Sequence, residues 1–281
     1  MNVVASFSII GDFARQVGGD HINLTTLVGP GGDAHVYEPK PSDAAAVQNA
    51  DIVLVNGLHF EGFLQRLVQA SATKAKIVEL SDGAETIEAE DGDEHGHDGD
   101  GHHHEALDPH AFQSVANAII YVSNVAHAFC EIDAARCNDY EANAGAYTVK
   151  LQTLDGEIKS AVASIPSDKR KIITSHDAFG YFEHAYGIRF MAPEGLSTDS
   201  EASAADVAKL VKQVREEDAS AIFVESITDP RLIQQIAAET GLRIGGTLYS
   251  DALSASDGPA PTYIDMMRYN VNIIKGAILG S

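Results

Sequence analysis

Short apolar runs alternate with amphipathic stretches through most of the chain. Between the runs lie segments such as IGDFARQVGG and ADVAKLVKQVREED, whose apolar residues recur at helical spacing. Eight runs have the length and composition of buried strands, at 3–8, 23–28, 51–57, 76–80, 171–176, 188–193, 220–226 and 242–248. Strands that alternate with helices over short connections form mainly parallel sheets covered by helices on both faces. The pattern therefore predicts an α/β fold.

The two halves of the chain resemble each other. The segment SFSIIGDFARQVGGDHI (6–22) can be aligned with SHDAFGYFEHAYGIRFM (175–191). Four identities then coincide at one fixed offset, as the pairs Ser6/Ser175, Gly11/Gly180, Phe13/Phe182 and Gly18/Gly187. The strand–helix order repeats as well, which favours an internal duplication. We therefore predict two similar lobes, at 1–132 and 166–281.

A long helical pattern lies between these lobes. From 133 to 165, apolar residues recur mostly three or four positions apart, with Asp133 as a candidate N-cap and Pro166 as a stop signal. One helix over 134–164 would be about 45 Å long at about 1.5 Å per residue. We predict that 133–165 is a backbone helix joining the lobes. Two shorter helices inside the second lobe are the alternative, because two glycines in this stretch weaken a helix.

The charge balance limits the classes of partner. Asp and Glu number 41 against 19 Lys and Arg, giving a formal net charge of −22. Such a charge argues against nucleic acid or an anionic membrane as partner, and it suits either a cationic ligand or solubility alone. The sequence contains no run of 18 or more apolar residues, so no membrane-spanning helix is predicted. Because the chain opens directly on a core-like strand, either the protein is cytoplasmic or a signal peptide has been removed and Met1 added.

The two cysteines bear on the compartment. Cys130 and Cys137 lie seven positions apart, across the predicted helix end at Asp133. This spacing suits a local disulfide between adjacent helix ends, which requires an oxidising compartment. The alternatives are two unrelated buried thiols or half of a zinc site, although the latter lacks a CxxC pattern. We predict the disulfide.

Four polar residues follow predicted strands. His35, His110, His176 and Asp251 each occupy the carboxyl end of a strand or the loop beyond it, the edge where open α/β sheets bind ligands. Three imidazoles and one carboxylate complete the four-coordinate shell that zinc accepts, and leave no position for an activated water. The set therefore predicts a protein that holds a metal and is not an enzyme. Taken alone it is only suggestive, because histidines at strand ends more often pack or face solvent.

Several motifs in order resemble a known family. Five segments are similar to parts of the metal-binding components of bacterial ABC-type zinc and manganese importers, the cluster A-I solute-binding proteins. They are HVYEPKPSD, NGLHFEGFL, LDPHAF, ITSHDAFGYF and AETGLRIGGTLYSDALS. The resemblance extends from the first strand to about Tyr269. It implies two α/β lobes joined by a long helix, with the metal in the cleft between them. It also implies that the four metal ligands are His35, His110, His176 and Asp251.

The third ligand bears on the choice of metal. Family members that look manganese-selective tend to carry Glu at the position of His176, and imidazole suits zinc better than manganese. The resemblance therefore implies a periplasmic monomer that captures Zn²⁺ as cargo and delivers it to an ABC permease and its ATPase. A zinc-donating periplasmic protein is a further candidate partner. The alternatives are a metal-binding surface adhesin of the same family and a zinc-dependent hydrolase, which the absence of HExxH disfavours.

An acidic, histidine-rich segment interrupts the first lobe at about 88–105. Its glycines and like charges predict a flexible loop, and many zinc-specific family members look similar here. We expect five histidines to gather zinc weakly near the cleft, at His95, His97, His102, His103 and His104. A merely solvated insertion is the alternative. Glu61 and Glu225 are candidate acceptors that orient ligand imidazoles, or else ordinary carboxylates.

Overall fold

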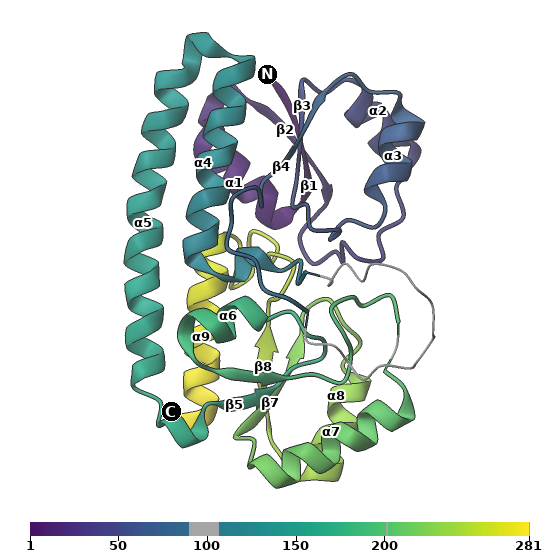
Figure 1. Ribbon diagram of the computed structural model, residues 1–281, viewed down its shortest axis with the longest axis vertical. Coiled ribbons are helices and arrows are strands. Elements are labelled where there is room, and N and C mark those ends of the chain that lie inside the picture. Colours follow the sequence, from purple (N-terminus) through teal and green to yellow (C-terminus); the bar gives the residue numbers. More distant parts are fainter. Residues whose placement is uncertain (90–106, 201, 281) are drawn as a thin grey trace, which may run out of the picture.

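Two four-stranded parallel sheets form the centres of two lobes in the computed structural model, which describes residues 1–89, 107–200 and 202–280 (Figure 1). The first sheet has the order β2-β1-β3-β4, with β1 (Asn2–Phe7), β2 (Asn23–Val28), β3 (Ile52–Val55) and β4 (Lys76–Glu79). The second has the order β6-β5-β7-β8, with β5 (Lys171–Ile173), β6 (Arg189–Met191), β7 (Ala221–Glu225) and β8 (Ile244–Leu248). All eight predicted strands are present.

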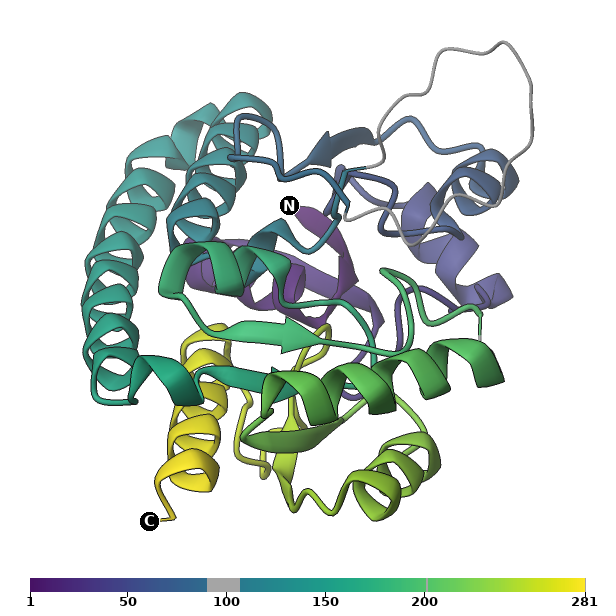
Figure 2. The same ribbon diagram turned by 60° about the horizontal axis from the view of Figure 1, so that its bottom comes forward.

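Helices cover both faces of each sheet, as predicted (Figures 1 and 2). The helices of the first lobe are α1 (Ser8–Gly18), α2 (Pro41–Gln48), α3 (Leu64–Ser71) and α4 (Val115–Ile132). Those of the second are α6 (Gly180–Tyr186), α7 (Ala204–Glu217), α8 (Arg231–Thr240) and α9 (Tyr263–Leu279). Short 3₁₀ turns occupy Gly19–His21, Ala111–Gln113, Ala134–Arg136 and Ser167–Lys169. The two sheets have the same strand order, so the repeat read from the sequence corresponds to a repeated fold.

One long helix spans both lobes. Helix α5 (Cys137–Ala163) packs against α1 and α4 in the first lobe and against α9 in the second (Figure 1). It begins three residues later than predicted, because 134–136 form a 3₁₀ turn. Asp133 is the N-cap residue of this turn and not of α5, and its carboxylate makes no capping hydrogen bond but accepts one from Tyr140 Oη. The alternative of two shorter helices is wrong, and the lobe boundaries predicted at 132 and 166 lie at the end of α4 and just beyond α5.

The predicted disulfide joins Cys130, near the end of α4, to Cys137, the first residue of α5. Their Cα atoms are 4.5 Å apart. The bond ties the two helices together across the 3₁₀ turn at the end of the molecule remote from the second lobe (Figure 1).

Helix α4 is the one described helix that is long and apolar enough to cross a membrane, with a mean hydropathy of 1.3. Half of it is buried, and it packs against α1 and α5. Its hydrophobic residues therefore serve the core of the first lobe. That core continues through α5 into α9, while a separate apolar cluster lies between the second sheet and the helices α7 and α8.

Candidate metal centre

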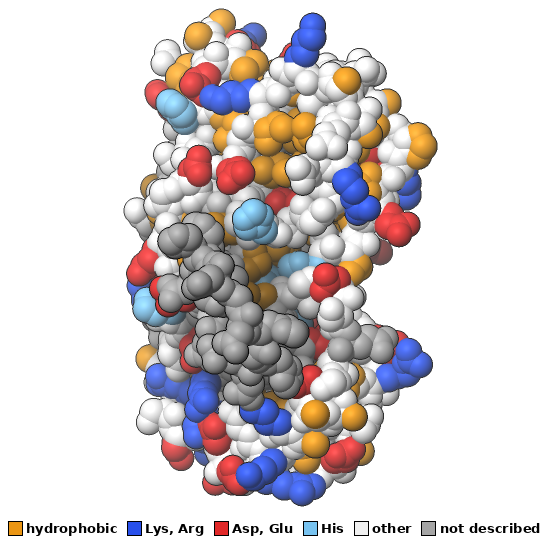
Figure 3. Space-filling model, turned by 45° about the vertical axis from the view of Figure 1, so that its right-hand side comes forward, with side chains coloured by type: hydrophobic (Ala, Val, Ile, Leu, Met, Phe, Trp, Pro, Cys, Tyr) orange, Lys and Arg blue, Asp and Glu red, His pale blue; other side chains and the backbone are white. Residues whose placement is uncertain are grey.

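Three imidazoles and one carboxylate meet between the two sheets. His35 lies on the loop after β2, His110 immediately before the turn that leads into α4, His176 just beyond β5, and Asp251 just beyond β8. One donor atom from each lies within 4.8 Å of the other three. Because the carboxyl ends of both sheets face the same cleft, residues far apart in sequence converge there. The surface is indented between the lobes, and a histidine side chain is visible in the indentation (Figure 3).

Four distances within this cluster are close to the edge lengths of a tetrahedral zinc shell. A tetrahedron with metal–ligand bonds of about 2.0–2.1 Å has edges of about 3.3–3.4 Å. The Nε2 atoms of His35 and His110 are 3.4 Å apart. Asp251 oxygens lie 3.3 Å from His35 Nε2, 3.7 Å from His110 Nε2 and 3.0 Å from His176 Nε2. Each imidazole therefore turns its Nε2 toward one common point beside the carboxylate.

The cluster is shielded from solvent. His110, His176 and Asp251 are fully buried, and the side chain of His35 is 4% exposed. Oδ1 of Asp251 is buried and has no hydrogen-bond partner among the described residues. A buried carboxylate oxygen without a partner is costly, and a bound cation removes that cost. The donor set and its burial therefore fit a metal ion.

The protonation of the cluster is set by opposing effects. Burial disfavours the charged form of His110, but the carboxylates of Asp251 and Asp108 outweigh it and raise the pKa to about 9. Burial likewise opposes the charged form of His176. Glu225 and Asp251 nevertheless hold the pKa of His176 well above its usual range. Burial raises the pKa of Asp251, yet the imidazoles of His110 and His176 outweigh this effect and hold the pKa well below its ordinary value. Without a metal, protons on the imidazoles therefore balance the carboxylate.

Two further carboxylates fix the orientation of the buried imidazoles. Asp108 Oδ1 lies 2.8 Å from His110 Nδ1, and Glu225 Oε2 lies 2.7 Å from His176 Nδ1. Such a contact keeps the proton on Nδ1 and leaves Nε2 free for a metal. Glu225 also accepts hydrogen bonds from the backbone N–H groups of Ser175 and His176. Glu225 was predicted from the sequence as such an acceptor, whereas Asp108 was missed, although its position two residues before a ligand histidine was the available signal.

Glu61 has another role. Its buried carboxylate accepts hydrogen bonds from Ser6 Oγ and from the backbone N–H groups of Asn56 and Gly57, and burial raises its pKa to about 7. Among the described interactions it contacts no imidazole of the cluster. It instead stabilises a tight turn in which Leu58 and His59 adopt positive φ angles. That turn presents Phe60 against His35 and His110, at ring-centroid distances of 4.6 and 5.6 Å.

The histidine-rich segment lies outside the described residues. The metal-gathering role predicted for His95, His97, His102, His103 and His104 therefore stays a prediction. The residues that flank the segment are described, and Glu88 pairs with Leu107 in an antiparallel bridge. The backbone N–H of Asp108 donates to the carbonyl of Ile87. The described residues on either side of the segment are thus paired with each other, three residues before His110.

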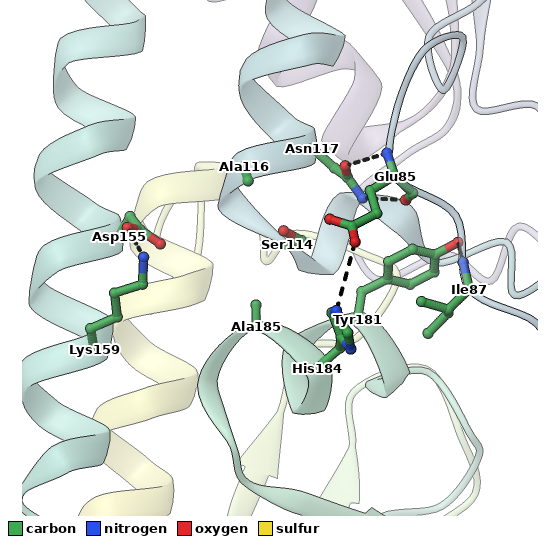
Figure 4. A pocket seen from close by; sticks show the side chains of 10 residues that line it. All are labelled: Glu85, Ile87, Ser114, Ala116, Asn117, Asp155, Lys159, Tyr181, His184 and Ala185. Atoms are coloured by element: carbon green, nitrogen blue, oxygen red, sulfur yellow. Dashed lines mark hydrogen bonds and ion pairs between the residues drawn. The ribbon is translucent and has the colours of Figure 1, made fainter.

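A separate cavity of about 260 Å³ lies where the lobes meet beside α5 and α6 (Figure 4). Glu85 from the first lobe approaches His184 of α6 across it, at 3.7 Å. Tyr181, also on α6, lines the cavity, and its hydroxyl accepts a hydrogen bond from the backbone N–H of Ile87 (Figure 4). The four clustered residues are not part of its lining, so the cavity marks a second interlobe contact apart from the metal centre.

Comparison with known proteins gives consistent matches over nearly the whole chain. Residues 3–277 match the family model described as zinc-uptake complex component A, periplasmic. The manganese-binding lipoprotein MntA of Halalkalibacterium halodurans is 35% identical over 97% of this chain and 86% of its own. The iron-binding protein YfeA of Yersinia pestis is 30% identical over 97% of this chain and 84% of its own.

Solved structures agree with these matches. A manganese-bound mutant of the periplasmic metal binding protein of Candidatus Liberibacter asiaticus superposes with a TM-score of 0.88 at 33% identity, covering 99% of both chains. The periplasmic zinc binding protein TroA of Treponema pallidum superposes with a TM-score of 0.89 at 28% identity, covering 99% of this chain and 98% of its own. The chain belongs to the zinc-uptake complex component A family, whose members are substrate-binding components of ABC metal importers and not enzymes.

Proposed function

We propose that this protein captures Zn²⁺ with His35, His110, His176 and Asp251 and hands it to an ABC permease. The observation that carries the proposal is the convergence of four donors within 4.8 Å of one another, with Asp251 oxygens 3.0–3.7 Å from the three Nε2 atoms. Asp108 and Glu225 support it, because they hold two imidazoles with Nε2 toward the centre. As the protein supplies all four ligands, the ion is held as cargo and no coordination position is left for an activated water.

The chemistry of the donors supports zinc as the cargo. Relatives of this chain are named for manganese, iron and zinc binding, so family membership does not decide the metal. Imidazole nitrogen suits zinc, whereas manganese favours carboxylate, carbonyl and water oxygen in octahedral geometry. Three nitrogens and one carboxylate therefore favour zinc. Competition between Zn²⁺ and Mn²⁺ for the metal-free protein tests this, and tighter binding of Mn²⁺ would overturn it.

The stoichiometry experiment separates the buried cluster from the histidine-rich segment. We compare metal content and zinc titrations of the wild type with a variant lacking residues 91–104. One tight zinc ion is expected in both, with additional weak binding in the wild type alone. A matched control carries Asp251→Ala in the same deletion background and should lose the tight site. Loss of tight binding on deletion alone would place the site in the segment and overturn the assignment.

The partners follow from the proposed role. An importer of this class works with a permease and its ATPase, and the disulfide between Cys130 and Cys137 suits an oxidising, periplasmic location. We propose a monomer that can receive zinc directly or from a zinc-donating periplasmic protein. Deleting the gene should lower zinc uptake in zinc-poor medium. Unchanged uptake together with lost surface attachment would instead support the adhesin alternative.

A further inference from the structure

The two ligands of the first lobe share a local motif. Each follows an aspartate by two positions, in Asp33-Ala34-His35 and in Asp108-Pro109-His110. In both cases the aspartate carboxylate accepts the backbone N–H of the ligand histidine, at 2.9 Å from His35 N and 2.8 Å from His110 N. Each aspartate therefore fixes the backbone that carries a ligand, independently of the metal.

A hydroxyl group from the second lobe reaches each of these aspartates. Tyr181 on α6 donates to the carbonyl oxygen of Asp108 at 2.7 Å. Thr198, on the loop between β6 and α7, donates to Oδ2 of Asp33 at 2.5 Å. Both first-lobe ligands are thus tied to the opposite lobe through an aspartate. We call these two hydrogen bonds the inner tie (Tyr181–Asp108) and the outer tie (Thr198–Asp33).

The inner tie belongs to a rigid surrounding. Tyr181 and Asp108 are both buried, at 2% exposure each. The carboxylate of Asp108 also holds the imidazole of His110, and Asn56 donates to the carbonyl of Pro109. With so many contacts on one short segment, loss of one hydrogen bond leaves His110 well supported.

The outer tie has fewer supports. Asp33 and Thr198 are only partly buried, and the backbone of His35 is too, although the imidazole itself is 4% exposed. No described carboxylate contacts Nδ1 of His35, whose ring is positioned by Phe60 and by its Nε2 neighbours. Besides the outer tie, the loop bonds to the second lobe through the backbone, from Gly31 N–H to the carbonyl of Leu253. His35 is therefore the ligand whose position depends most on a single side-chain hydrogen bond.

We propose that Thr198 is a positioning residue that holds His35 over the metal and thereby sets the rate of metal release. This inference rests on the proposed function, because it requires metal to bind at the buried cluster. The metal leaves when its least supported ligand moves away, and the loop that carries His35 moves only after the Thr198–Asp33 hydrogen bond breaks. The hydroxyl of Thr198 thus governs retention of the ion without contacting it.

The test measures zinc dissociation from the full chain loaded with one equivalent of Zn²⁺. Stopped-flow mixing with excess chromophoric chelator reports the rate for wild type and for Thr198→Val, which keeps the shape of threonine and removes its hydroxyl. A hydrogen bond to a charged group contributes enough for dissociation to accelerate roughly tenfold. The association rate should change little, because the four donors are unaltered. Thr198→Ser retains a hydroxyl and should restore a slow rate.

Two comparisons distinguish positioning from a general loss of structure. Ser197→Ala removes a neighbouring hydroxyl that, among the described residues, accepts a local hydrogen bond from the Asp199 N–H, and this variant should release zinc at the wild-type rate. In an Asp33→Ala background, Thr198→Val should have no further effect, because its partner is already gone. Melting of the metal-free variants shows whether each one folds.

The outcomes separate this inference from the proposed function. A wild type without one tight zinc ion would contradict the proposed function itself. Tight zinc binding with the same dissociation rate in Thr198→Val would overturn only the role of Thr198. Equal acceleration by Ser197→Ala, or an additive effect of Thr198→Val on Asp33→Ala, would likewise overturn it.

Discussion

The two lobes repeat the same fold but supply metal ligands in different ways. In each, a buried glutamate binds the carboxyl end of the strand that lies second in its sheet. Glu61 accepts a hydrogen bond from the hydroxyl of Ser6, near the end of β1, and Glu225 accepts one from the backbone N–H of Ser175, just beyond β5. The offset that aligns these serines also aligns Phe7 with His176. The same framework therefore ends in an aromatic residue in one lobe and in a ligand in the other.

Because Phe7 stands where the second lobe has His176, the two lobes contribute to the site in different ways. Phe7 packs on Phe60 and Phe112 and helps form the apolar side of the cluster. The first lobe instead offers its ligands from loops, each braced by an aspartate two positions earlier. In the second lobe, His176 and Asp251 follow strands directly and are fully buried. The second lobe is thus the preset half of the site, and the first lobe is the adjustable half at His35, since His110 is fully buried and well supported.

The largest expected effect comes from removing a ligand of the preset half. Asp251 contacts all three imidazoles, and Asp251→Ala removes the only negative charge among the four donors. Zinc affinity should fall by more than the roughly 100-fold that loss of an outer partner costs. His35→Ala should cost less, because a water can take the fourth position. Chelator competition measures both affinities, and a larger loss for His35→Ala would reverse the comparison.

Acidity should weaken zinc binding strongly. The pKa of His110 is raised to about 9 and that of His176 is also raised, so the metal-free protein favours the protonated form of both imidazoles. Zinc requires neutral imidazoles and must displace these protons. Affinity should fall by roughly 10- to 100-fold for each pH unit between 8 and 6, according to whether one or two protons are released. Calorimetry in buffers of different ionisation enthalpy counts the protons, and release of none would contradict the protonation inferred here.

The same shifts predict the stability of the metal-free protein. A histidine whose pKa is raised on folding stabilises the fold below its ordinary pKa of 6.5, and the contribution disappears as pH rises through the folded value. For His110 this window runs from 6.5 to about 9. The metal-free protein should therefore melt at lower temperature at pH 9 than at pH 6.5. Zinc should remove most of this loss, because the ion replaces the protons beside Asp251.

Substituting the buried glutamate of each lobe should have a smaller and more selective effect on zinc affinity. Glu225→Gln alters the group that contacts His176 Nδ1 and should lower zinc affinity about 10- to 100-fold. Glu61→Gln is the matched control, since Glu61 binds a turn and contacts no described imidazole of the cluster. It should leave zinc affinity nearly unchanged. Equal losses from both substitutions, measured by chelator competition, would show that the lobes use their glutamates alike.

Much of this architecture was readable from the sequence, because it depends on local patterns. Buried parallel strands are short apolar runs, and all eight were predicted near their observed positions. The long helix was predicted from its apolar spacing and the disulfide from the spacing of its cysteines, but the 3₁₀ turn before α5 was not, since the contact of Asp133 with Tyr140 depends on the folded structure. For the same reason the contacts of Thr198 with Asp33 and of Tyr181 with Asp108 could not be predicted. The repeated Asp-x-His spacing was visible, yet its meaning depends on the opposite lobe.

The smallest expected effect on metal binding comes from the disulfide. It closes a short loop at the far end of α4 and α5, away from the cleft (Figure 1). Replacing Cys130 and Cys137 with serine should lower the free energy of unfolding by about 2–3 kcal/mol, because the unfolded chain gains freedom. Zinc affinity should not change, since both halves of the site are held by contacts within the cleft. Urea unfolding and chelator competition on the same variant measure the two quantities. A tenfold loss of affinity would mean that the long helix transmits strain to the ligands, and that the difference between the lobes is not set at the site alone.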